Sequence, residues 1–197
     1  MKYFELQKIN KLTFGHEEIA RVLGITLPSA RVTANRYVKQ GLLIRVKRNL
    51  YILKERWEIL DRNQKFGVAN LIQSPSYISL VTALEYYQIT TQMQREYFES
   101  IGLKRSKQVE IEAGVFIFAK IQPSLYFGFG RKDGFFIATP EKAFLDAVYL
   151  TSLGRYNFDS AAIDFSKLDE RLIREHAKKF PLKTQKYLER YEYFRET

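Results

Sequence analysis

The sequence predicts an α+β fold, in which an N-terminal domain of helices and a hairpin precedes a mixed α/β domain that ends in helices. In residues 1–56, helical segments separated by glycine are followed by two short β-prone segments. Residues 57–197 contain strand-like runs rich in aromatic and β-branched residues, and then further helical segments. The net charge of +10 is concentrated at the start, because residues 1–56 hold 12 Lys/Arg and 4 Asp/Glu, against 20 and 18 in the rest.

Three helical segments are expected before residue 41. Apolar residues at helical spacing predict helices over residues 2–12 and 16–23, and Gly24 is a typical helix stop. A third helix is expected over about residues 26–40, and Gly41 can adopt the left-handed backbone conformation that ends a helix. The residues of this third helix expected to face inward are Leu27, Ala30, Ala34, Tyr37 and Val38.

A basic hairpin is expected directly after the third helix. Residues 43–46 and 50–53 are β-prone, and the turn Lys47-Arg48-Asn49 lies between them. Three helices followed by a hairpin within about 53 residues is the order of a winged helix-turn-helix. Residues 1–56 are therefore expected to form a DNA-binding domain, and residues 57–197 a second α/β domain.

The outward face of the third helix suits a DNA groove. Arginine can contact guanine, asparagine can contact adenine, and small side chains allow close approach to bases. A solvated charged face is the simpler alternative, but element order, glycine stop and local basic charge together favour a polyanion site. The hairpin tip, residues 47–49, would reach phosphates or the neighbouring minor groove. The outward helix residues are Ser29, Val32, Thr33, Arg36 and Lys39, with Arg31 and Asn35 at the edges.

The second domain contains strand-like runs between helices. Helices are expected over about residues 57–69, over residues 80–87 with Ser79 as cap, and from Thr139 and Pro140 to about Gly154. Strands are expected over residues 97–101, 109–113, 115–121, 125–129 and 135–138. Two last helices are expected, one after a capping box of Ser166 and Asp169, and one from Thr184 that includes Tyr187, Leu188, Tyr191, Tyr193 and Phe194.

Three sequence blocks in this order carry a family resemblance: GLLIRVKRNLY (residues 41–51), PSYISLVTALEYY (residues 75–87) and IATPEKAFLD (residues 137–146). With them the chain resembles the AbiEi-type antitoxins, the regulators of type IV toxin–antitoxin (abortive infection) systems. The resemblance implies a winged helix that binds and represses its own promoter. It also implies a C-terminal domain that counteracts a nucleotidyltransferase toxin.

By motif position, the resemblance also indicates which residues contact DNA. They are Ser29, Arg31, Thr33, Asn35, Arg36 and Lys39 in the helix, and Arg45, Lys47 and Arg48 in the hairpin. Asn49 is a departure, because the family often has glycine there, but asparagine tolerates the left-handed conformation. A homodimer on DNA is compatible with this interpretation.

Two alternatives stay open. Related chains can be stand-alone regulators without a toxin. A nucleic-acid-processing enzyme would use Glu141, Lys142 and Asp146 as acid–base groups. A capped structural helix is favoured for this block, because residues five apart on a helix diverge. We therefore expect no enzymatic activity.

Composition argues against several other kinds of site. The chain has no cysteine, and its two histidines, His16 and His176, lie far apart, so no metal site is expected. Residues 128–134 are not a dinucleotide fingerprint, since the last glycine is displaced by one residue and the segment reads as a hairpin. No cofactor is expected. Without a long apolar run or secretory leader, the chain is expected to be cytoplasmic and to have no membrane partner.

The middle of the chain is strongly aromatic. Such residues form cores, but an exposed aromatic patch on a near-neutral domain would indicate protein docking. The sequence leaves both roles open for Tyr86, Tyr87, Tyr97, Phe98, Phe116, Phe118, Tyr126, Phe127, Phe129, Phe135 and Phe136.

Overall fold

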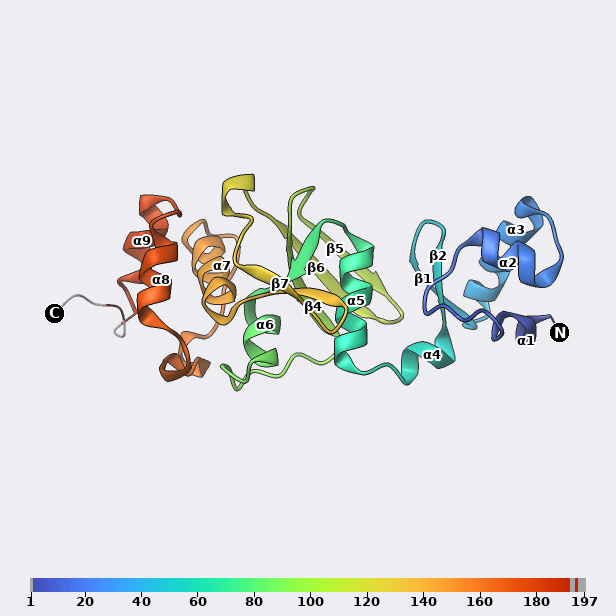
Figure 1. Cartoon of the computed structure of the whole chain (residues 1–197), viewed down its shortest axis with the longest axis horizontal. Coiled ribbons are helices and arrows are strands. Elements are labelled where there is room, and N and C mark those ends of the chain that lie inside the picture. Colours follow the sequence, from blue (N-terminus) through green and yellow to red (C-terminus); the bar gives the residue numbers. More distant parts are fainter. Residues whose placement is uncertain (1, 192–193, 195–197) are drawn as a thin grey trace. The chain divides into compact units, whose positions relative to one another are not determined.

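The computed structural model describes residues 2–191 and 194, and it is a mixed α and β protein (Figure 1). The chain divides into two compact units. The first unit is Met1–Lys65 with Glu110–Gly114, and the second is Phe66–Val109 with Val115–Thr197. The division falls later than the expected boundary at residue 56, inside a helix. None of the described helices has the length and apolar character that a membrane span requires.

The first unit begins with three helices, α1 (Tyr3–Leu6), α2 (His16–Leu23) and α3 (Leu27–Lys39). Gly24 ends α2 in the left-handed conformation with φ 62°, as expected. The N-cap of α3 is Thr26, whose hydroxyl accepts a hydrogen bond from the Ser29 amide at 3.4 Å. The helix expected over residues 2–12 is wrong beyond residue 6.

The early end of α1 has a physical cause in the guanidinium of Arg56. This group donates hydrogen bonds to the backbone carbonyls of Gln7, Ile9 and Lys11, at 2.6, 2.7 and 2.9 Å. A continuing helix would need these carbonyls for its own amides. The contact lies more than 40 residues away in sequence, so helical periodicity could not reveal it.

The basic hairpin forms as expected from β1 (Leu43–Lys47) and β2 (Leu50–Leu53), which pair antiparallel. Asn49 in its turn has φ 56°, the left-handed conformation that asparagine tolerates. The backbone of Phe14 joins the hairpin by exchanging hydrogen bonds with Tyr51 at 3.0 and 2.9 Å. A short third strand segment therefore lies where the sequence indicated only a break between helices.

The core of the first unit is built on the inner side of α3. Ala30, Ala34 and Tyr37 are buried there, and the two alanines allow close packing against α2. Val38 is partly buried against the same core. Leu27 was expected to face inward but is 52% exposed, because it is the first residue of α3 and lies at the end of the helix.

Two short helices follow the hairpin, α4 (Lys54–Glu58) and α5 (Arg62–Ile72), in place of the single helix expected over residues 57–69. The second unit contains a six-stranded sheet in the order β5-β6-β4-β3-β8-β7. Pairs β3–β4 and β7–β8 are antiparallel, and β3–β8 and β4–β6 are parallel. The strands are β3 (Ser76–Ile78), β4 (Tyr97–Gly102), β5 (Lys107–Ile111), β6 (Gly114–Lys120), β7 (Phe129–Lys132) and β8 (Phe135–Ala138).

The sequence missed the central strand β3, which is only three residues long, and it misplaced the edge strand β7. The strand expected over residues 125–129 is wrong, because Pro123–Leu125 forms a 3-10 turn and β7 begins only at Phe129. Two further 3-10 turns are Ser160–Ala162 and Phe165–Lys167.

Four helices complete the second unit: α6 (Leu80–Tyr86), α7 (Pro140–Ser152), α8 (Glu170–Ala177) and α9 (Leu182–Leu188). Helix α7 packs against α6, α8, α9 and β8, so its residues are buried on almost every side (Figure 1). The hydroxyl of Thr139 caps α7, as expected. The described part of α9 ends before the expected residue 194, and Tyr193 of that prediction lies outside the described residues.

Two other expected caps are wrong. Ser79 makes no capping hydrogen bond with its side chain; its hydroxyl donates to Asp146, and the carboxylate of Glu99 accepts from the Thr82 amide in the first turn of α6. At α8 the cap is Asp169 itself, which accepts from the Leu172 amide at 3.0 Å. Ser166 instead belongs to the preceding 3-10 turn.

A buried ion pair ties α7 to the sheet. Lys142 and Asp146 are both 0% exposed and form an ion pair within α7. The Lys142 ammonium also donates to the Tyr77 hydroxyl at 2.9 Å, and Asp146 accepts from the hydroxyls of Tyr77 and Ser79 at 3.0 and 2.8 Å. Burial raises the pKa of Asp146, while the ammonium and the hydroxyl donors counteract that rise. Lys142 and Asp146, two of the three residues considered as enzymatic groups, are thus enclosed in a structural network.

We expect Lys142→Met to lower the free energy of unfolding by about 3–5 kcal/mol, because it leaves the Asp146 carboxylate buried without its cation. The double variant Lys142→Met/Asp146→Leu should lose less than the single variant. Urea denaturation followed by circular dichroism measures both. Lys183→Met, at an exposed lysine of α9, is the matched control. A loss for Lys142→Met as small as that of the control would contradict a structural role of the pair.

Candidate nucleic-acid interface

The outer face of α3 carries the side chains expected to contact DNA. With 3.6 residues per turn, the buried residues Ala30, Ala34 and Tyr37 define the inner side, and Val32 and Lys39 lie opposite. Val32 is 69% exposed, so the outermost ridge of α3 is accessible. The predicted residues at the surface are Ser29, Arg31, Asn35, Arg36, Lys39, Arg45, Lys47 and Arg48, while Thr33 is half-buried.

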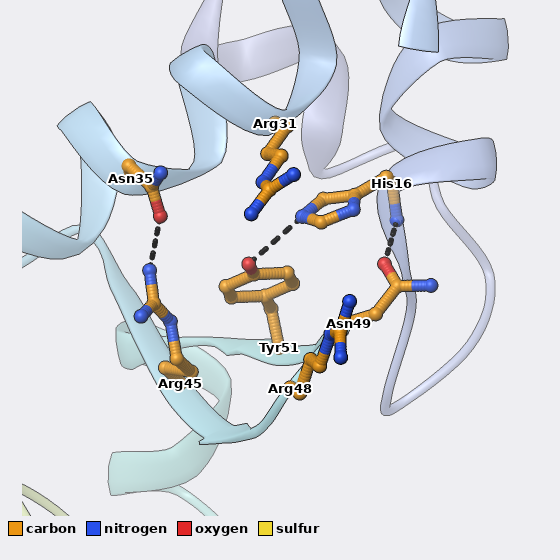
Figure 2. Close-up of a pocket in the computed structure, with 7 residues that line it drawn as sticks. All are labelled: His16, Arg31, Asn35, Arg45, Arg48, Asn49 and Tyr51. Carbon is orange, nitrogen blue, oxygen red and sulfur yellow. Dashed lines mark hydrogen bonds between the residues drawn. The ribbon is translucent and has the colours of Figure 1, made fainter. Parts of the chain in front are cut away.

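These residues fall into two groups, one on each side of the ridge. Arg31 and Asn35 line a hollow of about 430 Å³ with Arg45 and Arg48 of the hairpin; we call this the hairpin hollow (Figure 2). Its remaining lining residues are His16, Asn49 and Tyr51. A second hollow on the other side is lined by Ser29, Thr33 and Arg36, with Lys2, Leu23, Ile25, Tyr37 and Gln40. Lys39 and Lys47 line neither hollow.

Two of the predicted residues contact each other directly. The guanidinium of Arg45 donates to the side-chain oxygen of Asn35, and it also lies over the ring of Tyr51, 5.8 Å from the ring centre (Figure 2). An amide oxygen has two lone pairs, so Asn35 can still accept a second hydrogen bond. Arg45 therefore fixes the orientation of the Asn35 amide and leaves it able to contact another polar group.

His16 and Tyr51 form the floor of the hairpin hollow. Tyr51 is 2% exposed, and its hydroxyl is 2.9 Å from Nε2 of His16 (Figure 2). Figure 2 shows Arg31 extending from α3 towards these two rings. Burial lowers the pKa of His16, and the nearby positive charges of Arg31 and Arg45 lower it further.

The positive charge of the first unit is not spread evenly over its basic residues. Lys8, Lys11 and Lys54 are paired with Glu5, Glu18 and Glu112, and Arg56 is bound to backbone carbonyls. Within the part of the chain that the structure describes, no ion pair includes the basic residues of α3 or Arg45 and Arg48. Uncompensated positive charge therefore remains on the face formed by α3 and the hairpin.

Sequence reasoning did not assign His16 or Tyr51 to the site, and it placed Asn49 only in the hairpin tip. The side-chain oxygen of Asn49 accepts a hydrogen bond from the His16 amide at 2.7 Å, so it takes the place of a capping side chain that Gly15 lacks. A Cβ at Gly15 would lie 3.1 Å from both Oδ1 and the carbonyl oxygen of Asn49. Asparagine at position 49, where the AbiEi-type antitoxins that the sequence resembles often have glycine, is the sequence feature that bears on this contact.

Two other features that bear on chemistry are the acidic and histidine side chains and the glycine-rich segment of residues 128–134. Among residues 2–191 and 194, no group of three or more His, Cys, Asp or Glu side chains could hold a metal ion. Gly128 has φ 69° and lies against Lys142, since a Cβ there would be 3.0 Å from the Lys142 side chain. Packing against Lys142 therefore accounts for a glycine at this position.

We expect Asn49→Gly to keep the turn but to lose the hydrogen bond to the His16 amide, at a cost of about 0.5–2 kcal/mol in the stability of the first unit. Asn49→Ala should cost about 1–2 kcal/mol more, because alanine must also adopt the left-handed conformation. Thermal unfolding and hydrogen exchange at the His16 amide measure these effects. Asn10→Gly, at an exposed position, is the control. Unchanged His16 exchange in Asn49→Gly would show that the cap has no effect.

The chain matches no protein-family model, and it matches no curated protein.

Proposed function

We propose that the first unit is a winged helix-turn-helix that binds duplex DNA through α3 and the β1–β2 hairpin. The observation that carries the proposal is the hairpin hollow, which is lined by three arginines and by no carboxylate. A concentration of unpaired positive charge on one face of a helix and an adjacent hairpin is the electrostatic footprint of a phosphate-binding surface.

The ridge of α3 is the element proposed to enter the major groove. Val32 is small and exposed, and Arg36 and Lys39 lie beside it on the same face. Arg36 also lies over the ring of Tyr37, 5.4 Å from its centre, which supports its side chain from below. The hairpin would then lie over the sugar–phosphate backbone, where Lys47 and Arg48 suit phosphate contacts.

We further propose that the chain is the antitoxin of a type IV toxin–antitoxin system. In this role it represses its own promoter in the cytoplasm through the first unit and counteracts a nucleotidyltransferase toxin through the second. The family resemblance supports the assignment. Among the described aromatic residues of the second unit, several such as Phe98 and Phe116 are buried in the core, but Phe136 on β8 is 43% exposed; Met93 is 75% exposed. Both are candidates for contacts with a protein partner.

We expect Arg36→Ala to weaken binding to a duplex from upstream of the gene by about 1–3 kcal/mol, roughly 5- to 150-fold, because arginine contacts to bases contribute about that much. Binding to a scrambled duplex should change less. Arg48→Ala should weaken both duplexes alike and reduce the salt slope by about 1. Electrophoretic shift assays at several salt concentrations test both variants.

Arg21→Ala is the matched control for these assays, because Arg21 is an exposed arginine of α2 that lines neither hollow. If Arg36→Ala and wild type bind the upstream duplex equally, α3 is not the recognition helix. Binding that is equal for upstream and scrambled duplexes in the wild type would contradict a promoter-specific repressor.

The two roles should be separable by mutation. The full-length double variant Arg36→Ala/Arg48→Ala should lose repression of a promoter reporter but still protect cells from the nucleotidyltransferase encoded beside it. Phe136→Asp should show the opposite pattern, because it places a charge on the exposed face of the second unit. Reporter activity and growth during toxin expression give the two readouts. Failure of the wild-type chain to protect cells from that toxin would favour a stand-alone regulator.

A further inference from the structure

The hairpin hollow has a composition that base recognition alone does not require. Its three arginines come from three different segments: Arg31 from α3, Arg45 from β1 and Arg48 from the turn. They surround a floor formed by the buried ring of Tyr51 and the half-buried ring of His16 (Figure 2). The hollow lies at the edge of the outer face of α3, on the side of the hairpin, and not on the ridge proposed to face the bases.

We propose that the hairpin hollow is a binding site for a single phosphate group, held by Arg31, Arg45 and Arg48, and that His16 takes up a proton when the phosphate binds. The source is a backbone phosphate of duplex DNA or a free phosphate compound. The first of these sources rests on the proposed function, and the second does not.

The donors of the hollow fit a tetrahedral oxyanion. A guanidinium presents several N–H groups in a plane and binds phosphate oxygens in pairs. The Arg45 side chain is already held in place by Asn35 and by the Tyr51 ring, so little side-chain entropy is lost when it binds an anion. The hollow also contains no lining carboxylate that would repel one.

His16 connects the occupancy of the hollow to pH. In the empty hollow, burial and the two arginines hold the pKa of His16 below its ordinary value. A bound phosphate neutralises that positive field and favours the imidazolium, so the pKa rises on binding. Binding therefore takes up a proton, and affinity increases as the pH falls towards the pKa of the empty site.

Other charged groups near His16 do not provide the same coupling. The other charged groups that line the hollow are Arg31, Arg45 and Arg48, which are the proposed ligands of the phosphate. On α2 itself, Glu18 is bound to Lys11 and to the Gly15 amide, and its pKa is lowered to about 2. Glu17 directly follows His16 in α2, so its side chain points to a different side of the helix from that of His16. Glu18 therefore stays ionised while His16 titrates.

The first arm of the test uses inorganic phosphate and the full chain, at constant ionic strength maintained with sodium chloride. The ring protons of His16, assigned with His16→Gln, are followed by NMR. We expect a saturable shift, a higher His16 pKa in phosphate than in chloride, and roughly tenfold weaker binding for Arg48→Ala. Arg21→Ala should bind phosphate like the wild type.

The second arm uses the upstream duplex, because phosphodiesters carry no proton that titrates near neutral pH. Wild-type affinity should rise several-fold between about pH 8 and pH 6, and His16→Gln should remove most of this rise. The variant keeps the backbone amide that donates to Asn49, so the helix start stays intact. Circular dichroism confirms that the variant is folded.

The outcomes of the two arms are distinguishable. Saturable phosphate binding without any DNA binding would support the hollow, identify a free phosphate compound as its ligand and contradict the proposed function. DNA binding whose pH dependence is lost in His16→Gln supports the hollow with a backbone phosphate as ligand. The proposed phosphate site is wrong if two results are found together. Phosphate would change the NMR signals and the pKa of His16 no more than chloride does, and His16→Gln would bind DNA with the pH dependence of the wild type. DNA binding itself would still stand.

Discussion

The backbone pairing of Phe14 with Tyr51 is the constraint on which the candidate interface depends. These two residues exchange two hydrogen bonds and thereby hold the start of α2 beside the second strand of the hairpin. The side chain of Asn49 adds a contact to the first amide of α2. Without this junction, His16 would have no fixed position relative to Arg45 and Arg48. The hairpin hollow is therefore a product of tertiary pairing across more than 30 residues, and not of α3 alone.

Local signals were sufficient at Gly24, where α2 ends, and at Thr139, where α7 begins. Gly24 and Thr139 mark helix boundaries through backbone conformation and capping, which depend on neighbouring residues only. The sequence could not predict the short α1, because its end depends on a distant guanidinium. The same is true of β3, a central strand of three residues that is defined by its partners β4 and β8.

The candidate site shows the same division between local and distant causes. The exposed face of α3 followed from helical spacing around Ala30 and Ala34. Its separation into two hollows did not, because the hairpin covers one edge of the helix and leaves the other open to Lys2 and Gln40. The sequence gives the net charge of the first unit, but only the structure shows which basic residues are already bound within it. Lys8, Arg31 and Arg56 contribute one positive charge each, yet Lys8 is paired with Glu5 and Arg56 is bound to backbone carbonyls.

The bond between Arg45 and Asn35 has an evolutionary consequence. Each side chain contributes to the fixed geometry of the other, so a substitution at position 35 that suits a different ligand also releases the arginine. Effects of changes at the two positions are then non-additive. A change of ligand preference at position 35 of α3 therefore requires a compensating change at position 45 of β1. Homologous chains should show these two positions changing together.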